Sequence, residues 1–76
     1  MLTFQGTIRQ IDLDTKIGTF RTEDNINIRV DFNTISISAV KNAFLADNNT
    51  IIKIKGEYAN AEIFKVKYLF IYDTGV

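Results

Sequence analysis

Six basic residues of this chain fall at alternating positions of segments that read as β-strands. Side chains on alternate residues of a strand share one face, so aligned cations of this kind can follow the phosphates of a single-stranded nucleic acid. They can also be a solvated face that keeps a sheet soluble, and the zero net charge favours this second interpretation. The six residues are Arg21, Arg29, Lys53, Lys55, Lys65 and Lys67.

The residue types that most enzymes and metal sites need are missing, because the sequence has no histidine and no cysteine. Histidine is the commonest general base and metal ligand, and cysteine supplies disulfides and thiolate ligands. Ser36 and Ser38 therefore have no histidine to activate them. Asp12 and Asp14 begin like a calcium loop, but Lys16 stands where the next oxygen ligand is needed. We predict no catalytic residue, no cofactor and no metal site.

Length and composition indicate one small globular domain over residues 1–76. The hydrophobic share of 46% argues against disorder, and a chain of this size exposes much of its surface. No apolar run is long enough to span a membrane, and the N-terminus lacks a signal-peptide core. We expect a cytoplasmic protein without membrane contact.

Five segments alternate apolar and polar residues with a period of two, and a sixth segment has helical spacing. The sequence predicts an all-β class with one short helix, in the order β-β-β-α-β-β. The predicted strands are 2–11, 17–22, 26–32, 51–58 and 64–72, and the predicted helix is 36–46.

The helix prediction rests on Ile37, Val40 and Phe44, which share one face at helical spacing. We expect this face to be buried and the helix to close one mouth of a barrel. Asn48 or Asn49 is expected in the left-handed conformation that often ends a helix. The candidate N-cap residues are Thr34, Ser36 and Ser38.

Because alternate residues of a strand share one face, the inward-facing residues determine the register of the hairpin between the second and third predicted strands. Phe20 and Ile28 must both face inward, and a three-residue loop at 23–25 sets them opposite each other. Asn25 is then the residue expected in the left-handed region.

The last hairpin leaves two alternatives open. A five-residue loop at 59–63 sets Gly56 opposite Val66, with both facing inward. Leu69 and Ile71 then fall on the outer face of the last strand, although both are apolar. Either a β-bulge after Val66 exchanges the two faces, or the end of the strand is buried on both sides.

Binding of a single-stranded nucleic acid also needs aromatic rings exposed on the sheet, on which bases can stack. The positions of Tyr68, Phe70 and Tyr72 depend on the bulge, which would turn some of them outward beside the lysines. We expect these rings in the core, because a small domain has few apolar groups to spare. The other rings have inward parity and are predicted core residues: Phe4, Phe20, Phe32, Phe44, Tyr58 and Phe64.

Three aliphatic residues of the last two strands, Ile51, Leu69 and Ile71, are candidates for an exposed apolar strip. Apolar patches on a small soluble domain often mark a protein interface, including an interface between two copies of one chain. The alternative is that these residues contact the predicted helix or the N-terminal strand.

The chain resembles OB-fold domains in two segments. One is Phe4-x-Gly6-x-Ile8 in the first strand, and the other is the sequence Ile-Lys-Ile-Lys-Gly at 52–56. Together with the order of elements, the resemblance implies a five-stranded Greek-key barrel with a helix between its third and fourth strands. Glycines isolated inside strands often mark bends or close backbone approach, as barrel corners need. Domains of this family bind oligonucleotides, oligosaccharides or proteins, so the resemblance implies a binding module.

The sequence therefore predicts a small non-enzymatic binding module that mediates protein–protein interaction, self-association included, or serves as an accessory domain. The alternative is binding of single-stranded nucleic acid through a basic face of the barrel. The exposure of rings on the outer side of the last hairpin distinguishes these two hypotheses.

Overall fold

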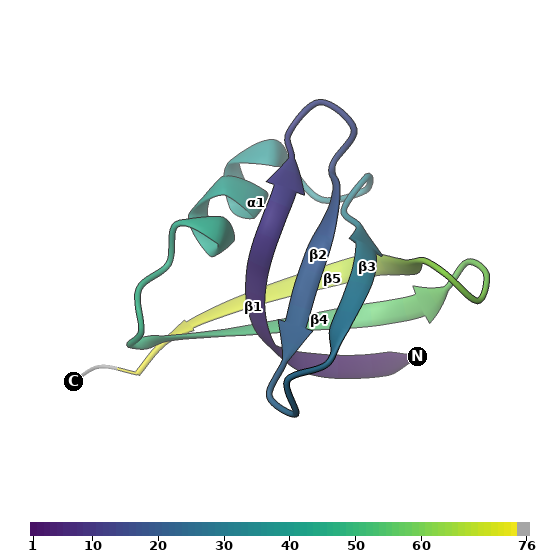
Figure 1. Ribbon diagram of the computed structural model, residues 1–76. Helices are drawn as coiled ribbons and strands as arrows, with labels where there is room; N and C mark the ends of the chain where they lie inside the picture. The colour runs from purple at the N-terminus through teal and green to yellow at the C-terminus, as the bar shows by residue number, and fades with distance from the viewer. Residues whose placement is uncertain (75–76) are drawn as a thin grey trace.

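Five strands close into a barrel in the order β1-β2-β3-β5-β4, and one short helix packs against β1 and β5 (Figure 1). The computed structural model describes residues 1–74. This architecture and its element order confirm the predicted class, and the ends of the elements agree with the prediction to within two residues. The elements are β1 (Leu2–Asp12), β2 (Ile17–Thr22), β3 (Asn27–Asp31), α1 (Ile37–Phe44), β4 (Thr50–Tyr58) and β5 (Phe64–Asp73).

The barrel closes through β1, which is long enough to pair with two strands. Its first half pairs with β4 and its second half with β2, and Gly6 belongs to both ladders, opposite Ile52 and Thr22. A Cβ at Gly6 would lie 1.9 Å from the carbonyl oxygen of Arg21, so any other residue would displace the backbone. The close approach predicted for this glycine is confirmed.

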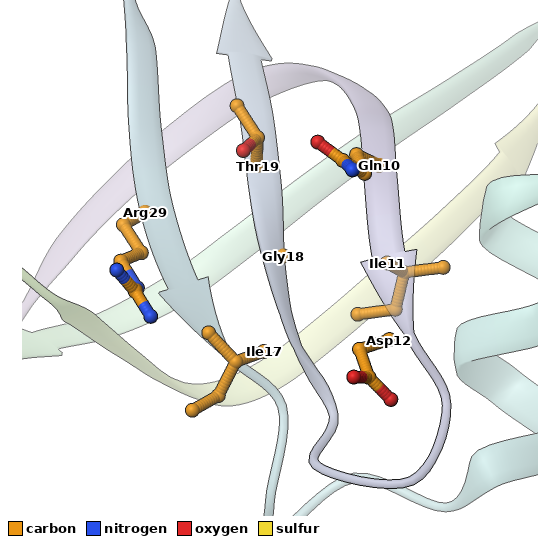
Figure 2. A pocket seen from close by; sticks show the side chains of 7 residues that line it. All are labelled: Gln10, Ile11, Asp12, Ile17, Gly18, Thr19 and Arg29. Atoms are coloured by element: carbon orange, nitrogen blue, oxygen red, sulfur yellow. The ribbon is translucent and has the colours of Figure 1, made fainter.

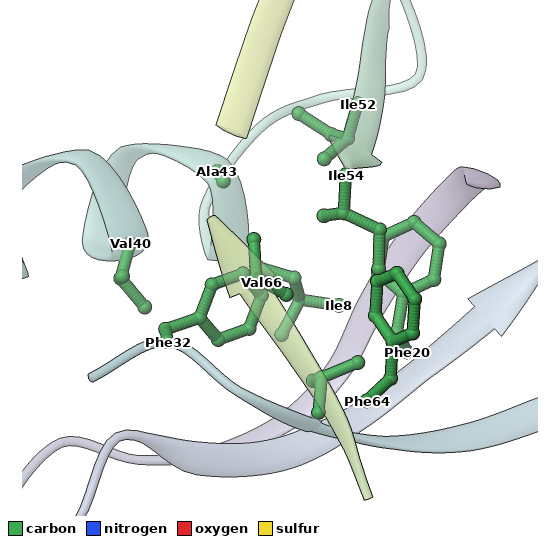
Figure 3. Packing of buried hydrophobic residues seen from close by; sticks show 10 residues of the cluster. Ile8, Phe20, Phe32, Val40, Ala43, Ile52, Ile54, Phe64 and Val66 are labelled. Atoms are coloured by element: carbon green, nitrogen blue, oxygen red, sulfur yellow. The ribbon is translucent and has the colours of Figure 1, made fainter. Parts of the chain in front are cut away.

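The core is a cluster of aliphatic and aromatic side chains to which every strand and the helix contribute (Figure 3). Phe20, Phe32 and Phe64 are fully buried, as predicted, and Phe4 is half-buried against them. Tyr58 is 44% exposed, so its predicted core position is wrong: its ring packs edge-on against Phe64 from outside the cluster. The buried cluster is Ile8, Phe20, Val30, Phe32, Val40, Ala43, Ile52, Ile54, Phe64 and Val66.

Helix α1 is capped by Ser36, one of the predicted caps, whose hydroxyl oxygen accepts a hydrogen bond from a backbone N–H three residues later. The buried residues of the helix are Val40 and Ala43, so the face turned to the barrel is rotated from the predicted one. Ile37 and Phe44 are 43% and 41% exposed, and their predicted burial is wrong. A helix of little more than two turns presents only a narrow buried stripe, and packing against β1 and β5 selects that stripe.

Left-handed backbone occurs at Lys16 and Asn25 among the non-glycine residues of 1–74, with φ of 60° and 63°. Asn25 follows the prediction for the loop between β2 and β3, and the pairing of Phe20 with Ile28 confirms the predicted register. The C-cap of the helix is Leu45, with φ of −89°, and neither Asn48 nor Asn49 has a positive φ, so the left-handed asparagine expected after the helix is wrong.

Candidate binding surface on the last hairpin

The hairpin of β4 and β5 contains a β-bulge at Lys67. Gly56 lies opposite Val66, as predicted, but the next pair joins Lys55 with Tyr68, so Lys67 has no cross-strand partner in the register. One extra residue moves every later side chain of its strand to the opposite face. The bulge after Val66, one of the two alternatives left open by the sequence, is confirmed.

The bulge turns three rings outward on β5, and we call Tyr68, Phe70 and Tyr72 the aromatic row. Their side chains are 52%, 37% and 48% exposed. Neighbouring ring centroids lie 6.4 and 6.3 Å apart, and the ring planes are inclined by 21° and 11°, so the rings are nearly parallel. The prediction that these rings belong to the core is wrong, because Leu69 takes the inward position and packs against the buried cluster.

Two lysines of β4 lie beside the aromatic row on the same outer face. Lys53 lies opposite Phe70, and Lys55 lies opposite the first ring of the row. The ammonium nitrogen of Lys53 is 5.8 Å from the centroid of the Tyr72 ring, which is within the range of a cation–π contact. This surface therefore combines flat apolar faces with positive charge.

The strand on the other side of β4 does not neutralise these two charges. Lys53 lies opposite Gln5 on β1, and Lys55 lies opposite Thr3. Neither neighbour carries a charge. The positive charge beside the aromatic row is therefore not balanced across the β1–β4 ladder.

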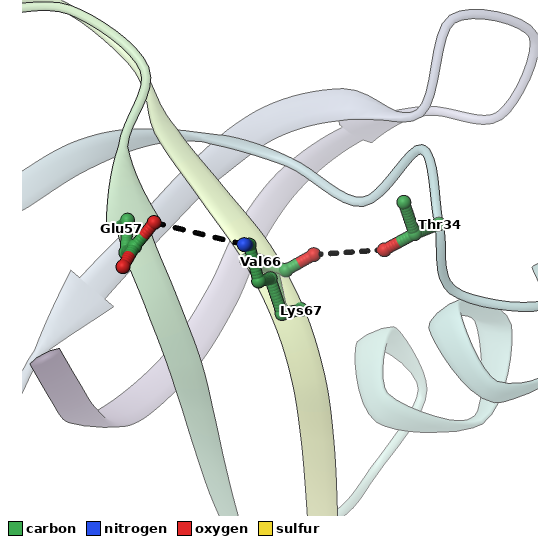
Figure 4. A network of polar contacts seen from close by, with 4 residues as sticks. All are labelled: Thr34, Glu57, Val66 and Lys67. Atoms are coloured by element: carbon green, nitrogen blue, oxygen red, sulfur yellow. Dashed lines mark hydrogen bonds and ion pairs between the residues drawn. The ribbon is translucent and has the colours of Figure 1, made fainter. Parts of the chain in front are cut away.

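The other two lysines of the hairpin lie among carboxylates. Lys65 pairs across strands with Glu57 on one side and Asp31 on the other. The ammonium nitrogen of Lys67 lies 3.6 Å from a carboxylate oxygen of Glu57 (Figure 4). An exposed ion pair of this kind adds at most about 1 kcal/mol of stability, but it balances the local charge. The four lysines of the hairpin thus form two groups with different electrostatic surroundings.

The two arginines lie on another part of the barrel. Arg21 on β2 and Arg29 on β3 belong to the outer faces of their strands, and β1 and β5 separate these strands from β4. Arg29 lines an open depression of about 360 Å³ together with residues of β1 and β2 (Figure 2). The Nε atom of Arg21 is buried without a hydrogen-bond partner. The six basic residues therefore do not form one continuous face.

The apolar strip predicted from Ile51, Leu69 and Ile71 does not form. Leu69 is half-buried, and Ile71, on the same face of β5, is 40% exposed. Ile51 lies opposite Tyr72 on the outer face. The bulge is the reason, because it turns the two β5 residues inward while Ile51, on the strand without a bulge, keeps its side.

Beyond the bulge, β5 has a neighbouring strand on one side only. Its parallel pairing with β3 ends at Lys65. The carbonyl oxygen of the next residue, Val66, accepts a hydrogen bond of 3.1 Å from the hydroxyl of Thr34 (Figure 4). From Lys67 onward, β4 is the only strand of residues 1–74 that pairs with β5. Among residues 1–74, the aromatic row therefore lies on a strand that has a strand partner on one side only.

Within the described chain, no three potential metal ligands gather in one place, and no helix has the length and apolar character to cross a bilayer. Compared with known proteins, the chain matches no family model, no curated protein and no solved structure. The surface of the β4–β5 hairpin is therefore the feature of the molecule that bears most directly on function.

Proposed function

We propose that this protein is a non-enzymatic OB-like module that binds single-stranded nucleic acid on the outer face of β4 and β5. The observation that carries the proposal is the exposed aromatic row with Lys53 and Lys55 beside it. Base stacking and phosphate contact are the two interactions that sequence-tolerant single-strand binders combine. The closed strand order, with a helix between β3 and β4, supports the OB-like part of the proposal.

The competing hypothesis was a protein interface on Ile51, Leu69 and Ile71. It is weakened because these residues lie on two faces of the hairpin and Leu69 packs against the core. The nucleic-acid hypothesis required rings on the outer side of the last hairpin, and three are found there.

Stacking supplies most of the expected affinity, because the protein has no net charge. Each base stacked on an aromatic side chain contributes about 1–3 kcal/mol, so the aromatic row is expected to give micromolar binding after the nucleic acid is ordered. If each of the two lysines neutralises one phosphate, log affinity should fall with log salt with a slope of about −1.4. Strongly basic domains have much steeper slopes.

The test is a titration of fluorescently labelled oligothymidylate with the protein at low salt, followed by anisotropy. The double variant Tyr68→Ala/Tyr72→Ala removes two stacking faces and should weaken binding at least about tenfold. The double variant Lys53→Gln/Lys55→Gln should weaken binding moderately and flatten the salt dependence.

The matched control is Lys65→Gln/Lys67→Gln, which removes the same charge from the same hairpin but at positions near Glu57. This control should bind almost as well as the unmodified protein. The proposal is wrong if the oligonucleotide causes no anisotropy change at low salt. It is also wrong if both lysine pairs matter equally while the rings do not, because binding would then be non-specific charge attraction.

A further inference from the structure

The aromatic row has a regular repeat along β5. The ring centroids of Tyr68 and Phe70 lie 6.4 Å apart, and those of Phe70 and Tyr72 lie 6.3 Å apart. A nucleic-acid strand whose bases stay stacked on one another advances only about 3.4 Å per nucleotide. The rings therefore repeat at nearly twice the spacing of a stacked strand, and successive bases can each meet one ring only if the strand is extended.

The two lysines beside the row have the same repeat. Lys53 and Lys55 are alternate residues of β4, so their Cα atoms are separated by about 6.8 Å along the strand. Although Lys53 lies opposite Phe70, its ammonium nitrogen is 5.8 Å from the ring centroid of Tyr72, so it lies at the step between these two rings. Lys55 stands one repeat earlier, opposite Tyr68. Each of the two steps between rings thus has a lysine beside it.

The surface that combines rings with lysines has an end on each side. Tyr72 is the last outward residue of β5, which ends one residue later, and Ile51, opposite Tyr72, carries no charge. In the other direction, the next outward residue of β4 after Lys55 is Glu57, which forms an ion pair of its own and repels phosphate. The surface between these ends contains three rings and two lysines.

A segment of three nucleotides contains three bases and two linking phosphates, which are the same numbers. On the basis of the proposed function, we infer that the aromatic row binds three consecutive nucleotides of an extended single strand, with one base on each ring. The two phosphates within this segment lie toward β4, within reach of Lys53 and Lys55. This site is shorter than the span of about 4–16 nucleotides that OB-folds commonly cover.

The ring spacing also selects the class of strand. A duplex does not fit, because its bases are paired and stacked at about half the spacing of the rings. A strand bound in this way loses the stacking of its bases on one another, so weakly stacked pyrimidine runs are the cheapest to bind. Oligothymidylate is therefore the probe that suits this site.

The middle base meets the middle ring whichever way the strand runs. Reversal of the strand direction along β5 exchanges the bases on Tyr68 and Tyr72. The middle base stacks on Phe70 in both directions. The contact between the middle base and Phe70 can therefore be tested without knowledge of the strand direction.

The first test is a length series of unlabelled oligothymidylates from two to six nucleotides without terminal phosphates, followed through the amide chemical shifts of the protein. From two to three nucleotides the affinity should rise at least about fivefold, because the third base gains a ring and the second phosphate gains a lysine. Each further nucleotide should raise it at most about twofold, because it only adds equivalent positions along the strand.

The length at which the last large step occurs separates the modes of binding. A last large step at two nucleotides would mean that bases insert between neighbouring rings. A last large step at five would mean that the bases stay stacked and only alternate ones reach a ring. Either result would overturn the site of three nucleotides.

The second test is a thermodynamic cycle between the protein and the trinucleotide. Phe70→Ala and removal of the middle base should each weaken binding at least about fivefold. Together they should weaken it no further, because both remove the same contact. Tyr68→Ala and Tyr72→Ala are the matched controls, since each should multiply its loss with that of the missing middle base. If the loss from Phe70→Ala multiplies in the same way, the middle base does not lie on Phe70 and the inference is wrong.

The two tests also distinguish this inference from the proposed function. If no oligothymidylate shifts any amide signal, the proposed function fails and the site of three nucleotides fails with it. If longer oligonucleotides bind through the rings and through Lys53 and Lys55, but without a step at three nucleotides, the proposed function stands and only the inferred site is wrong.

Discussion

The two halves of β5 differ in nearly every physical respect, although they belong to one continuous strand. Before the bulge, Phe64 and Val66 are fully buried, and β5 lies between β4 and β3. After the bulge, Tyr68 and Phe70 face solvent, and β4 is the only strand partner among the described residues. One additional residue, Lys67, separates a strand that builds the barrel from a strand that presents rings. Strand register, and not aromatic content, decides which rings form a core.

The charges of the hairpin divide at the same place. On the barrel side of the bulge, Glu57 lies beside both Lys65 and Lys67. Beyond the bulge, Lys53 and Lys55 lie opposite aromatic residues of β5 and opposite uncharged residues of β1. The half that is least needed for barrel closure is thus also the half in which two lysines have no charged cross-strand neighbour.

The largest expected effect separates the two halves by their contribution to stability. Phe64 packs edge-on against Phe4 and Tyr58, with ring centroids 5.1 Å apart in both cases. Phe64→Ala should lower the free energy of unfolding by about 3–5 kcal/mol, which a small domain barely survives. Phe70→Ala should lower it by less than about 1 kcal/mol, because the ring stands at the surface. Urea unfolding followed by circular dichroism measures both, and equal losses would contradict the division of the strand.

Deletion of Lys67 tests whether the bulge residue is an insertion in an otherwise regular ladder. The deletion joins Val66, which faces inward opposite Gly56, directly to Tyr68, which faces outward opposite Lys55, so the two strands can pair in one uninterrupted register. The aromatic row should therefore stay exposed, oligonucleotide binding should be kept, and stability should change by less than about 1 kcal/mol. Nuclear Overhauser contacts between Leu69 and Ile54, which are cross-strand neighbours, report the register and should persist in the deletion variant. Loss of these contacts would show that the register after Val66 is not the one described.

The sequence was sufficient for the parts of the fold that depend on local alternation. The inward parity of Phe20 and Ile28 determines both the loop between β2 and β3 and the register of that hairpin. Gly6 lies inside an alternating strand pattern and not at a turn, and a glycine in such a place often marks a close backbone approach. Both inferences compare neighbouring segments only, and no knowledge of the rest of the barrel is required.

The features that the sequence left undecided depend on which other elements pack against a given strand or helix. Leu69 and Ile71 on the polar face signalled the bulge, but burial on both sides would have produced the same pattern. The buried face of α1 is set by the strands beneath it, which the spacing of Ile37 and Phe44 does not reveal. The grouping of the basic residues follows from which strands become neighbours when the barrel closes. Such non-local contacts have no local sequence signal.

A third prediction concerns the last tight contact before the bulge. A Cβ at Gly56 would lie 2.0 Å from the carbonyl oxygen of Lys65 and 3.1 Å from the backbone nitrogen of Lys67. Gly56→Ala should therefore force the bulged backbone apart, with a loss of about 1–3 kcal/mol in the free energy of unfolding. The neighbouring exposed variant Lys55→Ala is the control and should change stability by less than about 0.5 kcal/mol. Similar unfolding midpoints for the two variants would show that β5 does not approach β4 this closely.

A fourth prediction tests whether the two halves of β5 unfold as separate units. The hydroxyl of Thr34 donates to the carbonyl of Val66 where β5 loses its partner β3, so it holds the boundary between the halves. Thr34→Val preserves the shape of the side chain but removes the donor, and should lower stability by about 1 kcal/mol. Thr34→Ser keeps the hydroxyl and should have less effect. In hydrogen exchange, the valine variant should accelerate the amides of 68–73 more than those of 64–66, because the barrel half keeps strands on both sides. Equal acceleration along the whole strand would mean that the surface half is as firmly part of the barrel as the buried half.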